Sequence, residues 1–138
     1  MSNFKDFIGI PYKNLGREKS GCDCYGIVKL IFKEKRDILL PDFTELLYDK
    51  DWYKEHNHIL DNIWDSWVEV VYPYQVYDLL LFYSFELKSV VNHLGLVIDD
   101  DKFLHISSKY SSKVDKLNDY WKSRLYKALR YKKDGMNA

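Results

Sequence analysis

The stretch that decides the fold is Gly21-Cys22-Asp23-Cys24-Tyr25-Gly26, which runs directly into a segment of helical periodicity. Asp23 is a favourable N-cap residue, because its carboxylate can accept a hydrogen bond from an unpaired N–H group of the first turn. The apolar positions after it share the spacing of one helical face: Cys24, Ile27, Val28 and Ile31. The pattern predicts a helix from Cys24 to about Lys35. Gly26, which has no side chain, would let a strand or a substrate come close.

A thiol at a helix start is suited to nucleophilic chemistry, because the unpaired N–H groups and the helix dipole favour the thiolate. We therefore expect the Cys24 thiol to have a pKa below the ~8.5 of a free thiol. Cys22 precedes the cap and belongs to a turn, so Cys24 is the better candidate nucleophile. Two cysteines at this spacing point apart and do not suit a disulfide, so both are expected to be free.

Two histidines lie in adjacent strand-like runs, residues 92–98 and 102–106, which the turn-forming Asp99-Asp100-Asp101 separates. The pattern predicts a β-hairpin. If the loop is those three residues, Gly95 lies opposite His105, and His93 is a diagonal neighbour of His105 on the same face, ~7 Å away between backbones. A two-residue loop would send the two histidines to opposite faces. The other face is expected to be core: Leu94, Leu96, Ile98, Leu104 and Ile106.

This arrangement supports a catalytic triad hypothesis. His93 would accept the thiol proton of Cys24, and His105 would hydrogen-bond the far nitrogen of His93 and fix its tautomer. Two other interpretations of the cysteines stay open. They can be small buried residues, or they can join His93 and His105 in a tetrahedral zinc site, although Cys-x-Cys is not the usual zinc spacing.

Composition indicates one compact domain over residues 1–138, with 46% hydrophobic and 30% charged residues. Lys plus Arg and Asp plus Glu both total 21, so no global field favours nucleic acid. Met1-Ser2-Asn3-Phe4-Lys5-Asp6 does not read as a signal peptide, and no run of 18 apolar residues predicts membrane insertion. We expect no cofactor and no metal.

Two further segments carry secondary-structure patterns. Residues 42–71 predict one or two helices ahead of a strand near Val68 to Val71, and His56 and His58 in this segment are expected to be solvated. Residues 114–130 fit a helix or loop followed by a last strand.

Several motifs together resemble the NlpC-type cell-wall endopeptidases, which are papain-like cysteine peptidases. The matching segments are Gly9-Ile10-Pro11-Tyr12, then residues 21–28, His93-Leu94-Gly95-Leu96-Val97 and Phe103-Leu104-His105, with residues 78–82 as a weaker match. The resemblance implies a papain-like α+β fold. Its amino-terminal helices, with the cysteine at a helix start, would pack on a central antiparallel sheet that carries both histidines.

The resemblance also implies roles for particular residues. Cys24 is the nucleophile, His93 the general base and His105 the third, orienting residue, while Tyr12 lies near the oxyanion hole. Asp23 and the position of Tyr25 belong to substrate binding, although many members have Ser where this chain has Tyr25. The implied substrate is the peptidoglycan stem peptide, cut between D-glutamate and the diamino acid through a thioester.

A narrower resemblance is to the branch found in tailed-phage tail tips, carried by Tyr25, Glu34 and Leu40-Pro41. It implies an enzyme made in the bacterial cytoplasm, held by other tail proteins in the virion and acting on the cell wall. A catalytically weak structural or assembly component of the tail is the alternative. Two departures stand out: Leu15-Gly16 replaces a glycine pair, and Tyr77 replaces the glycine before Asp78.

Overall fold

The computed structural model describes residues 2–41, 66–84 and 91–133 of the chain. Its elements follow one another along the chain as η1 (Ser2–Phe7), β1 (Arg17–Glu18), β2 (Gly21–Cys22), α1 (Cys24–Arg36), β3 (Trp67–Val70), β4 (Leu79–Tyr83), β5 (Val91–Asp99), β6 (Lys102–Ser107), β7 (Tyr110–Lys116), α4 (Asp119–Arg124) and β8 (Leu125–Tyr131). The helices expected within residues 42–65 lie outside the described residues, whereas β3 confirms the strand expected near Val68 to Val71.

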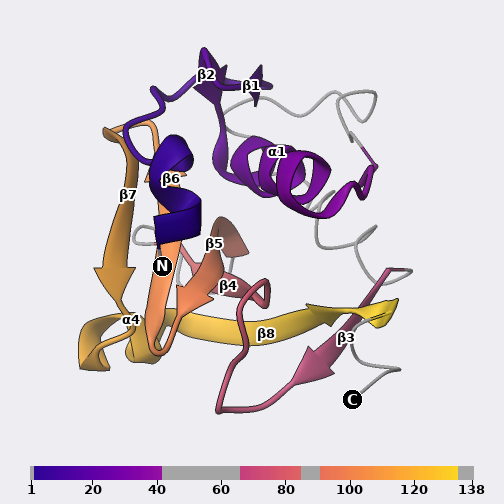
Figure 1. Cartoon of the computed structure of the whole chain (residues 1–138). Coiled ribbons are helices and arrows are strands. Elements are labelled where there is room, and N and C mark those ends of the chain that lie inside the picture. Colours follow the sequence, from indigo (N-terminus) through magenta and orange to yellow (C-terminus); the bar gives the residue numbers. More distant parts are fainter. Residues whose placement is uncertain (1, 42–65, 85–90, 134–138) are drawn as a thin grey trace.

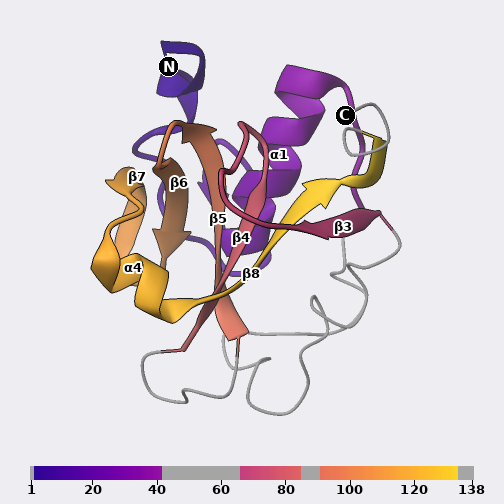
Figure 2. The same cartoon turned by 90° about the horizontal axis from the view of Figure 1, so that it is seen from below.

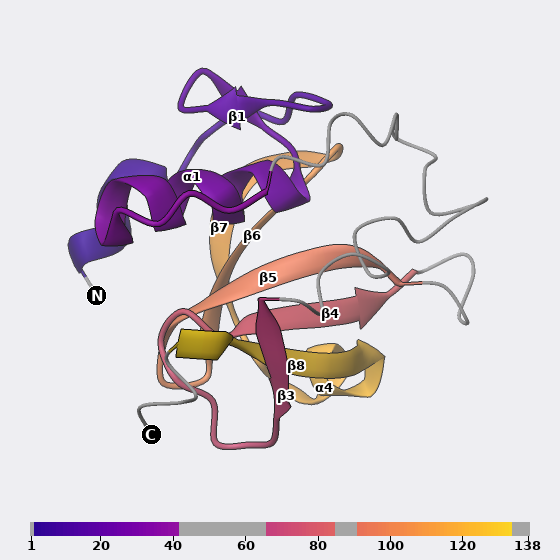
Figure 3. The ribbon, with the colours of Figure 1, turned by 90° about the vertical axis from the view of Figure 1, so that its right-hand side faces the viewer.

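The centre of the fold is a six-stranded antiparallel sheet with the order β3-β8-β4-β5-β6-β7. Figure 1 shows α1 lying across this sheet, and Figure 2 shows the strands fanning out in that order. In Figure 3, α1 and the short α4 lie on opposite faces of the sheet. The expected α+β architecture is thus confirmed.

Each face of the sheet has its own apolar cluster. The larger one joins α1 to Leu79, Leu81, Leu94, Leu96, Leu104 and Ile106. The smaller one, on the face of α4, contains Leu80, Phe82, Val97, Phe103, Leu117 and Ala128, with Trp121 packed against it. The five hairpin residues that the sequence analysis places in the core all belong to the larger cluster.

Helix α1 begins and ends as its sequence indicates. The Asp23 carboxylate accepts a hydrogen bond of 2.7 Å from the Gly26 N–H, which makes Asp23 the N-cap. Asp37 closes the helix in the left-handed conformation, and its N–H donates to the Phe32 carbonyl. A Cβ on Gly26 would come within 1.9 Å of the Gly16 carbonyl oxygen, so a close approach does occur at Gly26, but from the loop before β1 rather than from a strand or a substrate.

The β5–β6 hairpin confirms the expected register by a different route. Gly95 lies opposite His105, as the sequence predicts. The predicted three-residue loop is wrong, because Asp99 pairs with Lys102 and only two residues remain in the turn. A one-residue irregularity between residues 97 and 99 then shifts the register back. The two histidines therefore share a face despite the shorter loop.

Both departures from the family's glycines occur where the backbone has positive φ. Leu15 has φ of 61° and Tyr77 has φ of 79°, a region that glycine adopts far more easily than other residues. The backbone therefore keeps the conformation that a glycine would favour at each position. The Tyr77 ring lies 4.7 Å from the Arg36 guanidinium and packs beside Phe32 and Phe4.

Candidate active site

Cys24 occupies the first residue of α1 and lies against strand β5. The backbone N–H of Leu94 hydrogen-bonds its sulfur, and so does the N–H of Tyr25. The strand pairing between β5 and β6 ends at Gly95 and His105. The Leu94 N–H therefore lies just beyond the last ladder pair, where it is available to the thiol. This contact brings Cys24 next to the residue that follows His93.

The pKa of Cys24 differs from the sequence prediction. The pKa of Cys24 is raised to about 12, mainly by burial and then by the negative charge of Asp23. The hydrogen bonds from Leu94 and Tyr25 and the positive charge of Arg17 act in the opposite direction but do not outweigh burial. The expected depressed pKa is therefore wrong, because desolvation of the half-buried thiol outweighs the effect of the helix start.

Cys22 differs from Cys24 in its surroundings. It is fully buried, and its thiol donates a hydrogen bond of 3.0 Å to the Glu18 carbonyl. Burial raises the pKa of Cys22 to about 12. Both cysteines are free thiols, as expected. The contacts of Cys22 are those of a structural residue within the β1–β2 hairpin.

The two histidines form a direct contact, as the pleat of the hairpin predicts. His93 Nε2 lies 2.8 Å from His105 Nδ1. The other nitrogen of His105, Nε2, lies 2.7 Å from Asp115 Oδ2 on β7, and the Tyr110 hydroxyl lies 3.1 Å from His105 Nδ1. The sequence analysis missed Asp115 and Tyr110. The pairing of Phe103 with Asp115 would have revealed Asp115, had the turn before β7 been recognised.

An aromatic shell encloses the histidine pair on the face of α4. The Trp121 ring stacks on His93 at 5.9 Å and meets His105 edge-on at 5.1 Å. Phe103 lies 4.6 Å from the His105 ring, and Phe82 lies 5.9 Å from the His93 ring. His105 is fully buried. His93 is half-buried, so the aromatic side chains cover His105 completely and His93 in part.

Burial also sets the charge of the pair. The pKa of His93 is lowered to about 3, mainly by burial and then by the neighbouring His105 and Arg124. Burial lowers the pKa of His105 as well, while Asp115 raises it and Lys113 lowers it. With the raised pKa of Cys24, these shifts leave thiol and imidazoles neutral at rest around pH 7.

Tyr12 lies in the segment beside Cys22, to which its backbone forms a parallel bridge. Burial raises the pKa of Tyr12 to about 12, and the charges of Cys24 and Asp23 contribute. The hydroxyl therefore stays protonated at neutral pH and can donate a hydrogen bond. Its electrostatic coupling to Cys24 agrees with a place near the oxyanion hole.

Asp23 and Tyr25 are committed to contacts within the protein. The Asp23 carboxylate, besides capping α1, accepts hydrogen bonds from Arg17 at 2.9 Å and from the Leu15 N–H at 3.0 Å. Tyr25 is 1% exposed, and its hydroxyl donates to the Pro41 carbonyl at 2.6 Å. Neither side chain presents an open polar face in this structure, and substrate contact by either stays a prediction.

Within the described residues, no group of three or more His, Cys, Asp and Glu side chains is placed to hold a metal ion. The zinc interpretation therefore finds no support in the geometry of Cys22, Cys24, His93 and His105. Across the same residues, no helix is long and apolar enough to cross a membrane.

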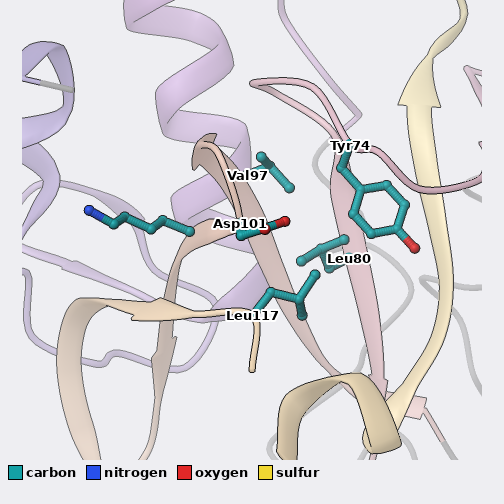
Figure 4. Close-up of a pocket in the computed structure, with 6 residues that line it drawn as sticks. Tyr74, Leu80, Val97, Asp101 and Leu117 are labelled. Atoms are coloured by element: carbon teal, nitrogen blue, oxygen red, sulfur yellow. The ribbon is translucent and has the colours of Figure 1, made fainter. Parts of the chain in front are cut away.

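A small depression lies on the sheet face away from α1 (Figure 4). It is lined by Tyr74, Leu80, Val97, Asp101, Lys102 and Leu117. Leu80 and Val97 belong to the smaller apolar cluster, whereas Cys24 packs against the larger one. The residues that line the depression do not include Cys24, His93 or His105.

Fold and site together define a class: an α+β protein with a thiol at a helix start and a histidine pair on the neighbouring antiparallel strands. The model of the NlpC/P60 family matches residues 9–130, and the chain belongs to this family. Family members are cysteine peptidases that act on peptidoglycan.

Three curated relatives are similar to this chain over most of its length. The chain is 26% identical over 131 residues to the murein DD-endopeptidase MepS/murein LD-carboxypeptidase of Escherichia coli K12, covering 94% of this chain and 60% of that protein. It is 29% identical over 116 residues to the tail tip assembly protein K of Escherichia phage N15 (80% of this chain, 45% of the relative). It is 28% identical over 127 residues to a gamma-DL-glutamyl hydrolase of Bacillus subtilis (91% and 27%).

Among solved structures, an NlpC/P60 family protein from Bacillus cereus superposes with a TM-score of 0.63 at 24% identity, over 91% of this chain and 36% of that one. This likeness concerns the fold. The chain spans 60% or less of the length of the three curated relatives named above.

Proposed function

We propose that residues 1–138 form a single peptidase domain that hydrolyses peptidoglycan stem peptides between D-glutamate and the diamino acid, with Cys24 as nucleophile. The observation that carries this proposal is the contact of His93 with His105 beside the strand residue that hydrogen-bonds Cys24. The family and the name of the gamma-DL-glutamyl hydrolase support the class of bond.

The resting pair is a neutral thiol and a neutral imidazole, so the proton has to move as the sulfur attacks. His93 Nε2 is engaged with His105. Its Nδ1 has no hydrogen-bond partner among the residues that the structure describes, and it is the atom that takes the Cys24 proton. The sulfur bonds to the γ-carbonyl carbon of D-glutamate. His93 then returns the proton to the leaving amine, and water hydrolyses the thioester.

The developing negative charge on the carbonyl oxygen needs hydrogen-bond donors. Tyr12 supplies one, because its raised pKa keeps the hydroxyl protonated. The positions of Asp23 and Tyr25 contribute to substrate binding through the shape they give the start of α1, where both are buried. Because Tyr25 replaces a serine, we expect the enzyme to differ from such members in which stem peptides it prefers at their free amino end.

A place in a phage tail tip is the finer part of the proposal. The similarity to the phage N15 tail tip assembly protein supports it. The partners would be other tail proteins and the bacterial wall, with the enzyme carried to the wall from outside. A weak or inactive structural component is the second candidate, favoured by the raised pKa of Cys24. It predicts that Cys24→Ala leaves particle assembly and infectivity unchanged.

Digestion of purified peptidoglycan and of defined stem peptides tests the activity. Wild type, Cys24→Ala and the matched control Cys22→Ala are compared under reducing conditions, with products identified by mass spectrometry. We expect cleavage at the D-glutamyl bond by wild type and by Cys22→Ala, and none by Cys24→Ala. Absence of cleavage by folded, reduced wild type would support the structural candidate. Cleavage of a D–D cross-link instead would keep the enzyme but change the bond.

A further inference from the structure

The chain of polar contacts that begins at His93 does not end at His105. It continues to Asp115 on β7, whose Oδ2 lies 2.7 Å from His105 Nε2. Asp115 pairs with Phe103, two residues before His105 on β6. Its side chain therefore lies on the same face of the sheet as the two histidines. Three neighbouring strands, β5, β6 and β7, each contribute one member of the chain (Figure 1).

The order of donors and acceptors in this chain follows from its last member. An ionised carboxylate only accepts hydrogen bonds. His105 Nε2 must therefore carry the proton that faces Asp115, which leaves Nδ1 of the neutral ring as an acceptor. His93 Nε2, 2.8 Å away, must then be the donor to that atom. A neutral His93 with its proton on Nε2 has its lone pair on Nδ1.

Two features around the rings favour this assignment of donors and acceptors. His105 is fully buried and Trp121 lies over both rings, so water does not offer His105 an alternative partner. The Tyr110 hydroxyl, 3.1 Å from His105 Nδ1, can donate to the same nitrogen. It agrees with an unprotonated Nδ1 without competing for the Nε2 proton.

We propose that Asp115 is a positioning residue that acts through His105 and sets the His93 tautomer whose Nδ1 accepts a proton. The inference rests on the proposed function in one respect, namely that the proton comes from Cys24. Because Asp115 faces the outer nitrogen of the second ring, its effect on His93 passes through the fixed tautomer of His105 and does not require direct contact.

The charges around the two histidines predict how the pH dependence of kcat/KM should change when one of them is removed. The charged and titratable groups that face the rings are Asp115, Lys113 and Tyr110 from β7 and Arg124 from α4. Asp115 favours protonated His105, and Lys113 opposes its protonation. Removing either charge should move the acid limb of kcat/KM, but in opposite directions.

The tautomers can be measured without any substrate. Long-range proton–nitrogen NMR spectra of the imidazoles distinguish protonated Nε2 from protonated Nδ1. The chain has four histidines, so a His56→Gln/His58→Gln background leaves the signals of the pair alone. In this background, with Asp115 intact, both His93 and His105 should be protonated at Nε2. Asp115→Ala should give a mixture that includes protonated Nδ1.

Kinetics on a stem peptide give the second readout. Asp115→Ala should lower kcat roughly 10- to 100-fold with KM unchanged, by analogy with the outer carboxylate partners that orient metal-bound histidines. Asp115→Asn should lose less, because the amide oxygen can still accept from Nε2, and its acid limb should move to lower pH. Lys113→Met should move the acid limb to higher pH. Asp100→Asn, an exposed turn residue, is the matched control and should behave as wild type.

The outcomes separate the two proposals. Unchanged tautomers in a folded Asp115→Ala variant, or protonated Nδ1 on His93 in the wild-type background, would overturn the role of Asp115. Equal kcat for wild type and Asp115→Ala would do the same. If the tautomers respond as expected while wild type cleaves no wall peptide, the role of Asp115 stands and the proposed substrate is wrong.

Discussion

The rate at which iodoacetamide alkylates Cys24 should follow the fraction of the thiol that is ionised, and the strongly raised pKa of Cys24 makes that fraction small. A Cys22→Ala background confines the reaction to Cys24. Burial and the charge of Asp23 raise the pKa of Cys24 to about 12, so the thiol is protonated at neutral pH. Asp23→Asn should speed alkylation, because it removes the negative charge beside the sulfur. Asparagine caps a helix about as well as aspartate, so α1 should stay intact.

The size of the effect follows from the pKa. At pH 8 a group of pKa about 12 is ionised in roughly one molecule in ten thousand. A free thiol of pKa ~8.5 is ionised in roughly one in four. The more basic thiolate is also the better nucleophile. Its higher reactivity offsets roughly 30- to 60-fold of the difference in thiolate population. The net rate should be on the order of 50-fold below that of the same cysteine in unfolded protein.

The decisive quantity is the slope of the logarithm of the rate against pH. Folded Cys22→Ala should rise about tenfold per pH unit from pH 6.5 to 10 without a plateau, because this range lies below the pKa. The same chain in guanidinium should level off above about pH 9. A rate for the folded protein that is independent of pH between 5 and 8 would refute the reasoning, since it would show a resting thiolate–imidazolium pair.

Three further predictions concern stability and are measured by urea unfolding. Arg130→Ala should destabilise the domain by about 3–5 kcal/mol, because it leaves the 1%-exposed Asp78 carboxylate without its two 2.8 Å contacts to the guanidinium; a loss below 1 kcal/mol would contradict a buried pair. Gly26→Ala should lose about 1–3 kcal/mol or more, since its Cβ would lie 1.9 Å from the Gly16 carbonyl oxygen and the backbone would have to move; wild-type stability would argue against that contact. At Leu15, with φ of 61°, the glycine variant should be more stable than the alanine variant by about 1 kcal/mol, and the reverse order would exclude the left-handed conformation.

Local patterns were enough to predict the parts of the site that lie close together in sequence. Asp23 caps the helix that starts at Cys24, because cap and first turn are neighbours in the chain. The pleat placed His93 and His105 on one face. That result survived a wrong loop length, since an irregularity between residues 97 and 99 restored the register.

Local sequence patterns did not predict the interactions between segments that are distant in the chain. The pKa of Cys24 depends on how far packing across the fold desolvates the half-buried thiol, and a helix start considered in isolation suggests the opposite shift. Asp115 is ten residues from His105 along the chain, and only the pairing of β6 with β7 brings the two together. The burial of Asp23 and Tyr25 likewise depends on Arg17 and Pro41.

Direct trapping of the covalent intermediate tests the central claim that Cys24 is the nucleophile. Wild-type protein is mixed with a stem peptide, quenched in acid within the first turnover, digested and fragmented in the mass spectrometer to locate any adduct. We expect a thioester on Cys24 carrying the acyl part of the peptide that ends in D-glutamate, and none on Cys22. An adduct on Cys22, or hydrolysis that persists in Cys24→Ala, would contradict the account.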